Sequence, residues 1–386
     1  MDLRGLIEKK KILICCGSGG VGKTTIAAAL GVQGAVSGQT VLALTIDPAR
    51  RLANSLGLSY IGNTETLVSP DKFRESGPAP KGALYAMMLD TKHAFDEVIE
   101  RYAPSAEVKR NILQNRFYQN LSAAMAGSHE YLAVEKLYQI FLRGRYDLIL
   151  LDTPPTRHAL DFLEAPNRVR AFFDRSVSTW FLKPYFKMGR MGLQLFNRTA
   201  GTFFKMLERV TGAEFLRDVS ELMAGLADAF DIFRSRADEV MHVLHGEATS
   251  FLLVTGTSPA ALDEATFFYR RLRQAGLPLG GCIVNRVHER PDSAEISTDG
   301  ALQSDAAPRD LLRYLEEERN MSRAMALRLV ENYSRYLRLW RKDEEVVRRF
   351  AKQFSGNTPV HTVPMFDRDI FDLPGLFRIN AHLFRG

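Results

Sequence analysis

Apolar residues along the chain fall into short continuous runs, separated by longer segments in which they recur at helical spacing. The strand-like runs are residues 10–16, 41–47, 84–90, 148–152, 251–255, 282–285 and 360–363. Such runs are typical of strands buried on both faces, and their alternation with helical patterns favours a parallel sheet with right-handed crossovers. We therefore predict a single α/β domain over residues 1–386, with a mostly parallel central sheet flanked by helices.

Two of the segments between strands are too long for one crossover helix. Residues 91–146 and 156–250 are expected to form an inserted helical subdomain above the carboxyl edge of the sheet. Residues 69–82 and 287–308 are rich in turn-forming residues and indicate loops. A second helical insertion is predicted at about 308–355, where an amphipathic helix packed on the body is expected from the spacing of Met325, Leu329, Tyr333, Leu337 and Trp340.

A glycine-rich segment, GSGGVGKTT, follows the first strand-like run and precedes a helix-forming run. In this motif the glycines let backbone N–H groups surround phosphates, the lysine reaches the β- and γ-phosphates, and the threonine hydroxyl can bind Mg²⁺. The sequence thus predicts a P-loop nucleotide hydrolase with Lys23 as a catalytic residue and Thr24 as a metal ligand. The predicted phosphate-binding residues are Gly17, Ser18, Gly19, Gly20, Val21, Gly22, Lys23, Thr24 and Thr25.

Two acids stand at the carboxyl ends of other strand-like runs, where open α/β sheets bind their ligands. Asp152 ends a run of four aliphatic residues and is the predicted magnesium ligand. Asp47 ends another run and is followed by a proline. Acids at this position also serve as helix caps, so Asp47 is either a cap or a member of the metal site that orients or deprotonates the attacking water.

The composition is that of an ordinary soluble protein, with 386 residues, 46% of them hydrophobic and 25% charged. No apolar stretch suits a membrane-spanning helix or a signal peptide, so a cytoplasmic location is expected. Three cysteines without a CxxC pair predict buried thiols and no bound zinc. The net charge of +6 is too mild for a nucleic-acid footprint and is compatible with at most peripheral membrane contact.

Six segments of the chain together match the pattern of one family. They are GSGGVGKTT, LTIDPARRL, LYAMMLD, LDTPPTRHALDFLEAP, Asn285–Arg286 and Val363–Pro364. They resemble the ArsA/GET-type ATPases, the family of the arsenite-pump ATPase and of the targeting factor for tail-anchored membrane proteins. The resemblance implies ATP and Mg²⁺ as cofactors, Asp47 as the water-activating acid and Asp152 in the magnesium shell. It also implies nucleotide contacts from Asn285, Arg286 and the segment around Pro364, and a dimer that closes on ATP.

The chain departs from the family pattern at three points. Ser18 stands where the family carries a lysine that reaches the partner's nucleotide, and Arg157 replaces the glycine of a Thr-Gly-His segment. The arsenite-binding cysteines and the zinc-binding CxxC have no counterpart. The missing charge could come from Arg157, from Arg50 or Arg51, or from a lysine-bearing paralogue in a heterodimer. Alternatively, Arg157 is a solvated surface residue and hydrolysis is slow.

Residues 176–207 combine aromatic residues and methionines with interleaved lysines and arginines. This pattern fits a groove for a hydrophobic transmembrane segment, and equally a subdomain core or a dimer interface. We predict a Mg-dependent ATPase whose dimer closure is coupled to binding a hydrophobic client. The alternatives are a regulatory nucleotide-binding subunit with weak turnover, paired with a paralogue, and a MinD-like membrane-surface ATPase, which the large helical insertions disfavour.

Overall fold

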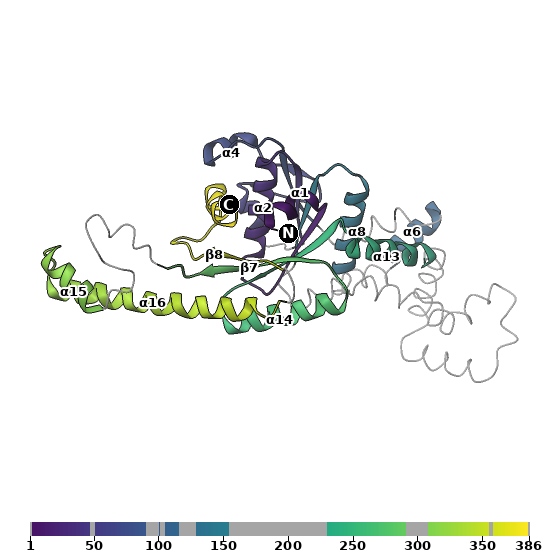
Figure 1. The fold of residues 1–386 in the computed structure, drawn as a ribbon. Coiled ribbons are helices and arrows are strands. Elements are labelled where there is room, and N and C mark those ends of the chain that lie inside the picture. The colour runs from purple at the N-terminus through teal and green to yellow at the C-terminus, as the bar shows by residue number, and fades with distance from the viewer. Residues whose placement is uncertain are drawn as a thin grey trace, which may run out of the picture.

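A single sheet runs through the protein in the computed structural model, with helices on both of its faces (Figure 1). The structure describes residues 2–46, 51–89, 100, 105–115, 129–153, 230–290, 308–354 and 358–384. Strand order across the sheet is β3-β4-β2-β5-β1-β6-β7-β8. The strands are β1 (Ile12–Cys16), β2 (Thr40–Thr45), β3 (Thr66–Leu67), β4 (Ala83–Met88), β5 (Leu148–Asp152), β6 (Thr249–Thr255), β7 (Leu279–Val287) and β8 (Val360–Pro364).

The seven predicted strands and the α/β class are confirmed. All seven pair in parallel, which is why the acids and glycines at their carboxyl ends meet at one edge. β3 is an eighth strand that pairs antiparallel with β4 at the sheet edge. The sequence does not reveal it because Thr66 and Leu67 are too short a run to show an alternating pattern.

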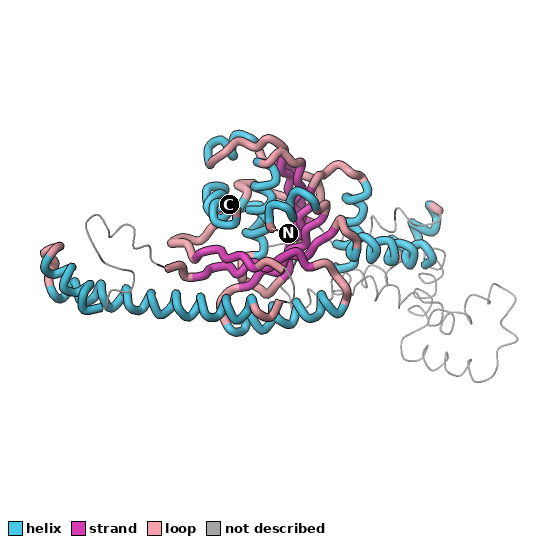
Figure 2. The backbone as a smooth tube through the Cα atoms, viewed as in Figure 1, coloured by secondary structure: helices cyan, strands magenta, loops and turns pink. Residues whose placement is uncertain are grey.

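Helices cover the two faces of the sheet in separate layers (Figure 2). In β1, Leu13 and Cys15 face one core while Ile12, Ile14 and Cys16 face the other, because side chains alternate along a strand. Helices α1, α2, α3, α4 and α17 contribute to the first core, and α6, α8, α13, α14 and α16 to the second. The helices are α1 (Leu3–Lys9), α2 (Lys23–Val36), α3 (Arg51–Ser55), α4 (Pro70–Ser76), α6 (Ala106–Gln114), α8 (His129–Leu142), α13 (Phe230–His245), α14 (Pro259–Gln274), α15 (Pro308–Glu317), α16 (Arg323–Ala351) and α17 (Leu373–Leu383).

Helix α4 corrects the expectation of a loop over residues 69–82. The Ser69 hydroxyl caps the helix by accepting a hydrogen bond from the Asp71 N–H at 3.3 Å, and Pro70 occupies the first turn. Proline is favoured there because its missing N–H has no partner to lose and its φ is already helical. Phe73 is fully buried and packs edge-on against Phe377 of α17. The serine–proline pair therefore starts a helix here.

The two predicted insertions are described only in part. α6 and α8 lie within residues 91–146, and α13 lies within 156–250. α8 and α13 pack on one another, and the Tyr138 hydroxyl of α8 donates a hydrogen bond to Glu239 of α13 at 3.0 Å. Residues 154–229, which include the segment 176–207, lie outside the described residues. The helical subdomain therefore stays a prediction.

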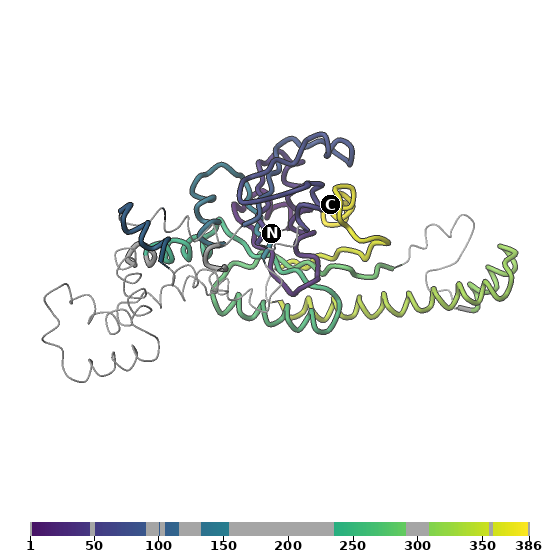
Figure 3. Tube along the Cα trace, turned by 180° about the vertical axis from the view of Figure 1, so that it is seen from behind, coloured from purple at the N-terminus to yellow at the C-terminus, as the bar shows by residue number. Residues whose placement is uncertain are grey.

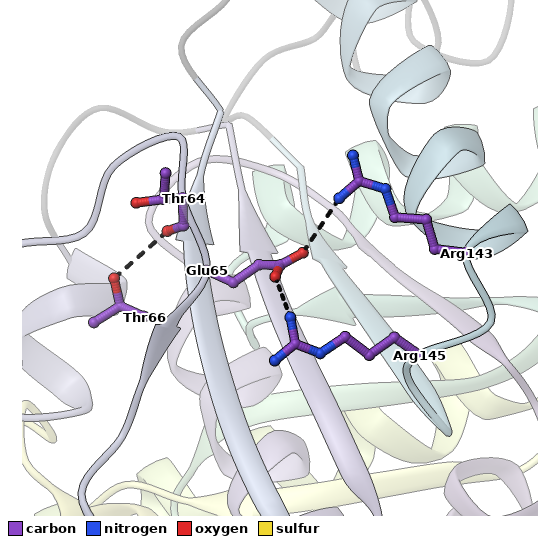
Figure 4. A network of polar contacts seen from close by, with 5 residues as sticks. All are labelled: Thr64, Glu65, Thr66, Arg143 and Arg145. Atoms are coloured by element: carbon purple, nitrogen blue, oxygen red, sulfur yellow. Dashed lines mark hydrogen bonds and ion pairs between the residues drawn. The ribbon is translucent and has the colours of Figure 1, made fainter.

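A polar cluster joins the end of α8 to the edge of the sheet (Figure 4). Glu65, just before β3, forms an ion pair with Arg145 at 2.6 Å and another with Arg143 at 3.8 Å. The Arg145 guanidinium also lies over the rings of Tyr85 and Tyr146, at 4.8 and 5.4 Å from their centroids. Burial raises the pKa of Tyr146, and the negative charge of Glu65 raises it further. The cluster fixes the approach of α8 to β3 and β4.

Helix α16 forms as the periodicity predicts, but its packing differs. Ala326 and Val330 are buried, whereas Met325 is 57% exposed and Leu329 is 40% exposed. The expectation that these two residues pack on the body is therefore wrong. In Figures 1 and 3, the first half of α16 extends past the sheet as an arm, and α15 folds back against it. Only the later part of α16, which carries the buried Phe350, joins the core.

Candidate nucleotide-binding site

The glycine-rich turn lies between β1 and α2, in the middle of the sheet, where β1 is flanked by β5 and β6. Gly17, Gly20 and Gly22 all have positive φ, at 148°, 78° and 97°. A Cβ at Gly17 would stand 2.0 Å from the Val254 carbonyl oxygen, and one at Gly22 would stand 2.3 Å from the Asn285 amide nitrogen. Gly17 and Gly22 are therefore required for two reasons: their backbone conformation disfavours other residues, and there is no space for a Cβ.

Lys23 is the first residue of α2, and only 5% of it is exposed. Its ammonium donates a hydrogen bond to the Ser18 carbonyl at 2.8 Å, so it folds back over the turn. The N-terminus of α2 adds its own partial positive charge at the same place. Burial raises the pKa of the neighbouring Cys16 thiol to about 12, although Lys23 partly opposes the shift. The thiol therefore stays neutral and leaves the positive charge of Lys23 available to an anion.

Asp152 ends β5 and is almost fully buried, at 1% exposure. Its Oδ2 accepts hydrogen bonds from the Thr24 hydroxyl at 2.7 Å and from the Thr45 hydroxyl at 3.0 Å. The carboxylate and hydroxyl oxygens are hard metal ligands, the kind that Mg²⁺ prefers, and they lie beside Lys23. The group therefore fits a magnesium ion, which Thr24 and Asp152 would hold.

Thr45 is a contributor that the motif did not point to. It is the Cα partner of Asp152 in the parallel pairing of β2 with β5, so strand register places its hydroxyl on the carboxylate. The sequence does not reveal this contact, because the run 41–47 ends two residues beyond Thr45, and aligning the two runs at their ends would pair Asp47 with Asp152. Asp47, two residues further along, lies outside the described residues.

Asn285 connects the end of β7 to the glycine-rich turn. Its Nδ2 donates to the Val21 carbonyl at 2.8 Å, and its Oδ1 accepts from the Arg286 N–H at 3.0 Å. Arg286 has a φ of 60°, and the pairing of β7 with β8 shifts register between Val284 and Val287. This irregularity turns the amide of Asn285 toward the turn instead of continuing the ladder.

A cavity of about 450 Å³ opens beside the turn. Ser18 and Val21 line it from the turn, Ser258 lines it from the start of α14, and Asn285 and Arg286 line it from β7. Pro364, the other predicted nucleotide contact, borders a second hollow together with residues that include Glu289, Asp367 and His382. The structure thus brings the glycine-rich turn, Asp152, Asn285 and Arg286 together and places Pro364 at a neighbouring hollow. Arg157 lies outside the described residues.

The part of the chain that forms this site matches a known protein family. The sequence profile of a family described as anion-transporting ATPase matches residues 10–304, a span that begins just before β1 and passes the end of β7. The chain belongs to the anion-transporting ATPase family. This confirms the resemblance drawn from the motifs, and by family the chain is an ATPase.

Individual relatives in the anion-transporting ATPase family are distant. A putative arsenical pump-driving ATPase 1 of Aquifex aeolicus is 26% identical over 295 residues, 72% of this chain and 63% of the relative. ATPase GET3C of Arabidopsis thaliana is 25% identical, over 74% of this chain and 69% of the relative. ATPase GET3 of Malassezia globosa is 23% identical, over 76% and 78%. The chain spans less than two thirds of the length of the first of these.

Among the helices that the structure describes, none combines the length and the apolar character that crossing a bilayer requires.

Replacing Gly22 should block nucleotide binding in this member of the anion-transporting ATPase family. In Gly22→Ala the new methyl group collides with the Asn285 amide, so the turn and Asn285 must separate and the N–H groups lose their shared direction. We expect the affinity for a fluorescent ATP analogue to fall at least about tenfold, because positioned hydrogen bonds to charge are worth roughly 1.5–3 kcal/mol each.

Gly144→Ala is the matched control. Gly144 also has a positive φ, of 62°, but a Cβ there would meet nothing within 4 Å. This variant carries a similar backbone strain, of about 1 kcal/mol, without crowding the turn. Equal nucleotide affinity in the two variants would contradict the role given to Gly22.

Proposed function

We propose that this chain is a cytoplasmic Mg-dependent ATPase whose ATP-gated dimer closure is coupled to binding a hydrophobic protein segment. The observation that supports hydrolysis is the convergence of Lys23, Thr24 and Asp152 at the N-terminus of α2, with Thr24 and Asp152 joined at 2.7 Å. A basic group for the phosphates and an oxygen pair for the metal are the parts that phosphoryl transfer needs.

The side chains then have distinct tasks. The Lys23 ammonium exchanges the Ser18 carbonyl for the β- and γ-phosphates and stabilises the charge that develops on them. Backbone N–H groups of the turn hold the phosphates in place, and Asn285 and Arg286 contact the rest of the nucleotide. Thr24 and Asp152 would hold Mg²⁺, which would supply positive charge for phosphoryl transfer. Asp47 is proposed as the acid that orients the attacking water.

The coupling to a hydrophobic client rests on the family and on composition. The family resemblance implies a dimer, and residues 176–207 carry the aromatic and methionine side chains that adapt to apolar helices. Their placement lies outside the described residues, so this part of the proposal rests on sequence.

Ser18 favours a second candidate, a regulatory subunit that pairs with a lysine-bearing paralogue. Ser18 is buried, at 7% exposure, and within the described part of the chain its hydroxyl has no hydrogen-bond partner. A serine cannot reach a partner's phosphates as the family lysine does. A homodimer must therefore obtain that charge elsewhere, and Arg157 is the proposed source.

The test is steady-state ATP turnover across protein concentration, with the mass measured in ADP and in a non-hydrolysable ATP analogue. We expect turnover per chain to rise with concentration and a dimer to form only with the analogue. Tight nucleotide binding with negligible turnover and no dimer would overturn the homodimer and favour the paralogue.

Arg157→Ala separates the two sources of charge within the same assay. A cation at the γ-phosphate is worth about 10³–10⁵ in rate where an arginine supplies it. An unchanged kcat in this variant would contradict compensation by Arg157.

A further inference from the structure

The cavity beside the glycine-rich turn extends away from the residues that gather at the N-terminus of α2. On this side it is lined by Thr257 and Ser258, which precede α14, and by Ala260 and Glu264 of α14. Lys23, Thr24 and Asp152 are not among the described residues that line it. Gly20 does line it, and a Cβ there would meet no atom within 4 Å. The α14 end of the cavity therefore has room for a ligand other than the phosphates that Lys23 would hold.

Ser18 brings an unused hydrogen-bonding group to this cavity. The residue is 7% exposed and lines the cavity, and within the described part of the chain its hydroxyl has no hydrogen-bond partner. Buried polar groups in folded proteins almost always have a partner, so one without a partner indicates a missing ligand, ion or water. The Ser18 hydroxyl therefore indicates that the cavity takes a polar ligand.

The N-terminus of α14 makes the same cavity favourable for an anion. Ser258 caps the helix, and its hydroxyl accepts a hydrogen bond from the Ala261 N–H at 3.3 Å. Pro259 has no N–H, so Ala260 carries the other backbone donor at the start of this turn. With 16 residues, α14 is long enough for its dipole to stabilise negative charge at this end. Arg286 lines the cavity from β7 and adds a positive charge.

Glu264 narrows the class of anion, because its carboxyl group belongs to the same lining. An ionised carboxylate can only accept hydrogen bonds, and it repels an anion that has no proton to donate. Inorganic phosphate keeps a proton at neutral pH, so one of its oxygens can donate to Glu264 while the others accept from Ser18 and from α14. Sulfate is fully ionised and cannot donate. The lining therefore favours phosphate over sulfate.

We propose that the α14 end of the cavity binds inorganic phosphate, with Ser18 and the N-terminus of α14 as donors and Glu264 as the acceptor of the phosphate proton. The role of this site rests on the proposed function, since a chain that hydrolyses ATP produces phosphate at the adjoining turn. The site would hold the released phosphate while ADP still occupies the turn. The binding itself needs no turnover and is tested without it.

The experiment is calorimetric titration of the full-length protein, saturated with ADP and Mg²⁺, with inorganic phosphate and then with sulfate at equal ionic strength. We expect phosphate to bind and sulfate to bind at least about tenfold more weakly, because a site built to accept a ligand's proton rejects an analogue that lacks it. Ser18→Ala should weaken phosphate binding about tenfold, the effect of losing one hydrogen bond to a charged ligand.

Glu264→Gln tests the basis of the selectivity. A carboxamide can donate a hydrogen bond to sulfate and can still accept one from phosphate. We expect the preference for phosphate to fall below about threefold, chiefly because sulfate binds more tightly than before. Asp263→Asn is the matched control. Asp263 is the adjacent acid on α14, is exposed, and is not among the described residues that line the cavity, so its loss should leave the preference unchanged.

Lys23→Ala distinguishes a phosphate ion in the cavity from one held inside the glycine-rich turn. Phosphate inside the turn would compete with ADP and would be lost in this variant, whereas phosphate at the α14 end should bind within a few-fold of its original affinity, because Lys23 does not line the cavity. A protein that fails to bind ADP would contradict the proposed function, and the preference of Lys23→Ala for phosphate over sulfate would still test this site.

Three results would overturn the proposal. The first is that phosphate binds neither to the ADP-saturated protein nor to Lys23→Ala. The second is that phosphate and sulfate bind equally well. The third is that Asp263→Asn changes the preference as much as Glu264→Gln does, which would show that only the net charge of the region matters.

Discussion

Lys23→Ala is expected to abolish most ATP turnover while leaving the fold intact. The Lys23 ammonium is the described cation buried at the N-terminus of α2, and its 2.8 Å bond to the Ser18 carbonyl shows that it reaches across the turn. A cation positioned on the transferring phosphoryl group contributes about 10³-fold or more to the rate. We therefore expect kcat, measured by phosphate release at saturating ATP, to fall by about that factor.

The folded state of this variant should survive. Alanine is the best helix former, so α2 still begins at its Gly22 cap. The Ser18 carbonyl loses its donor, but Ser18 lines the cavity, where water can replace the lysine. Thermal unfolding followed by circular dichroism should change little.

Lys11→Ala is the control for the loss of a positive charge near β1, the strand that leads into the glycine-rich turn. Lys11 precedes β1 at the opposite edge of the sheet and forms an exposed ion pair with Asp147 at 3.8 Å. Its removal should leave turnover unchanged. If Lys23→Ala retained turnover within a few-fold of the unmodified protein, the turn would not be the catalytic phosphate site.

The core of the site was predictable because its signal is local. The glycine-rich turn needs residues at fixed spacing between a strand and a helix, and Gly17, Gly22 and Lys23 lie in the structure as that spacing requires. Asp152 was predictable for a related reason, since a buried parallel strand can end in an acid only where that acid has partners. Here the partners are the hydroxyls of Thr24 and Thr45.

Other features depend on tertiary contacts that no local pattern encodes. Helical spacing identified α16, but the side of a helix that is buried depends on its neighbours, so Met325 is exposed and Ala326 is buried. Proline and glycine near the end of residues 69–82 indicate a loop, whereas Ser69 and Pro70 favour the start of a helix, and only the burial of Phe73 distinguishes the two. Pro364 lies near Asn285 in strand order, yet it borders a separate hollow.

Asp152→Asn is expected to weaken the activation of turnover by Mg²⁺ and to remove most of the turnover itself. The substitution keeps the shape of the side chain, and the amide oxygen can still accept hydrogen bonds from the Thr24 and Thr45 hydroxyls. It removes the negative charge that attracts a divalent cation. We expect the Mg²⁺ concentration for half-maximal turnover to rise and kcat to fall by about 10²-fold or more, as for other losses of positioned charge stabilisation.

The thermal stability of Asp152→Asn should stay the same or rise although its activity falls, so unfolding would not explain the lost turnover. Asp152 is 1% exposed, and a carboxylate held away from water carries a large desolvation cost that a neutral amide avoids. Without Mg²⁺ the variant should therefore unfold at the same temperature as the unmodified protein or a higher one.

Asp147→Asn is the matched control for this substitution. Asp147 stands just before the same strand, β5, at the opposite edge of the sheet, where it accepts the Thr40 N–H at 2.9 Å and is exposed to water. The two variants change net charge equally, so a general electrostatic effect would alter both. We expect only Asp152→Asn to shift the Mg²⁺ titration of turnover. An unshifted titration in Asp152→Asn would place the metal on other residues, because neutralising a ligand carboxylate must weaken the binding of its cation.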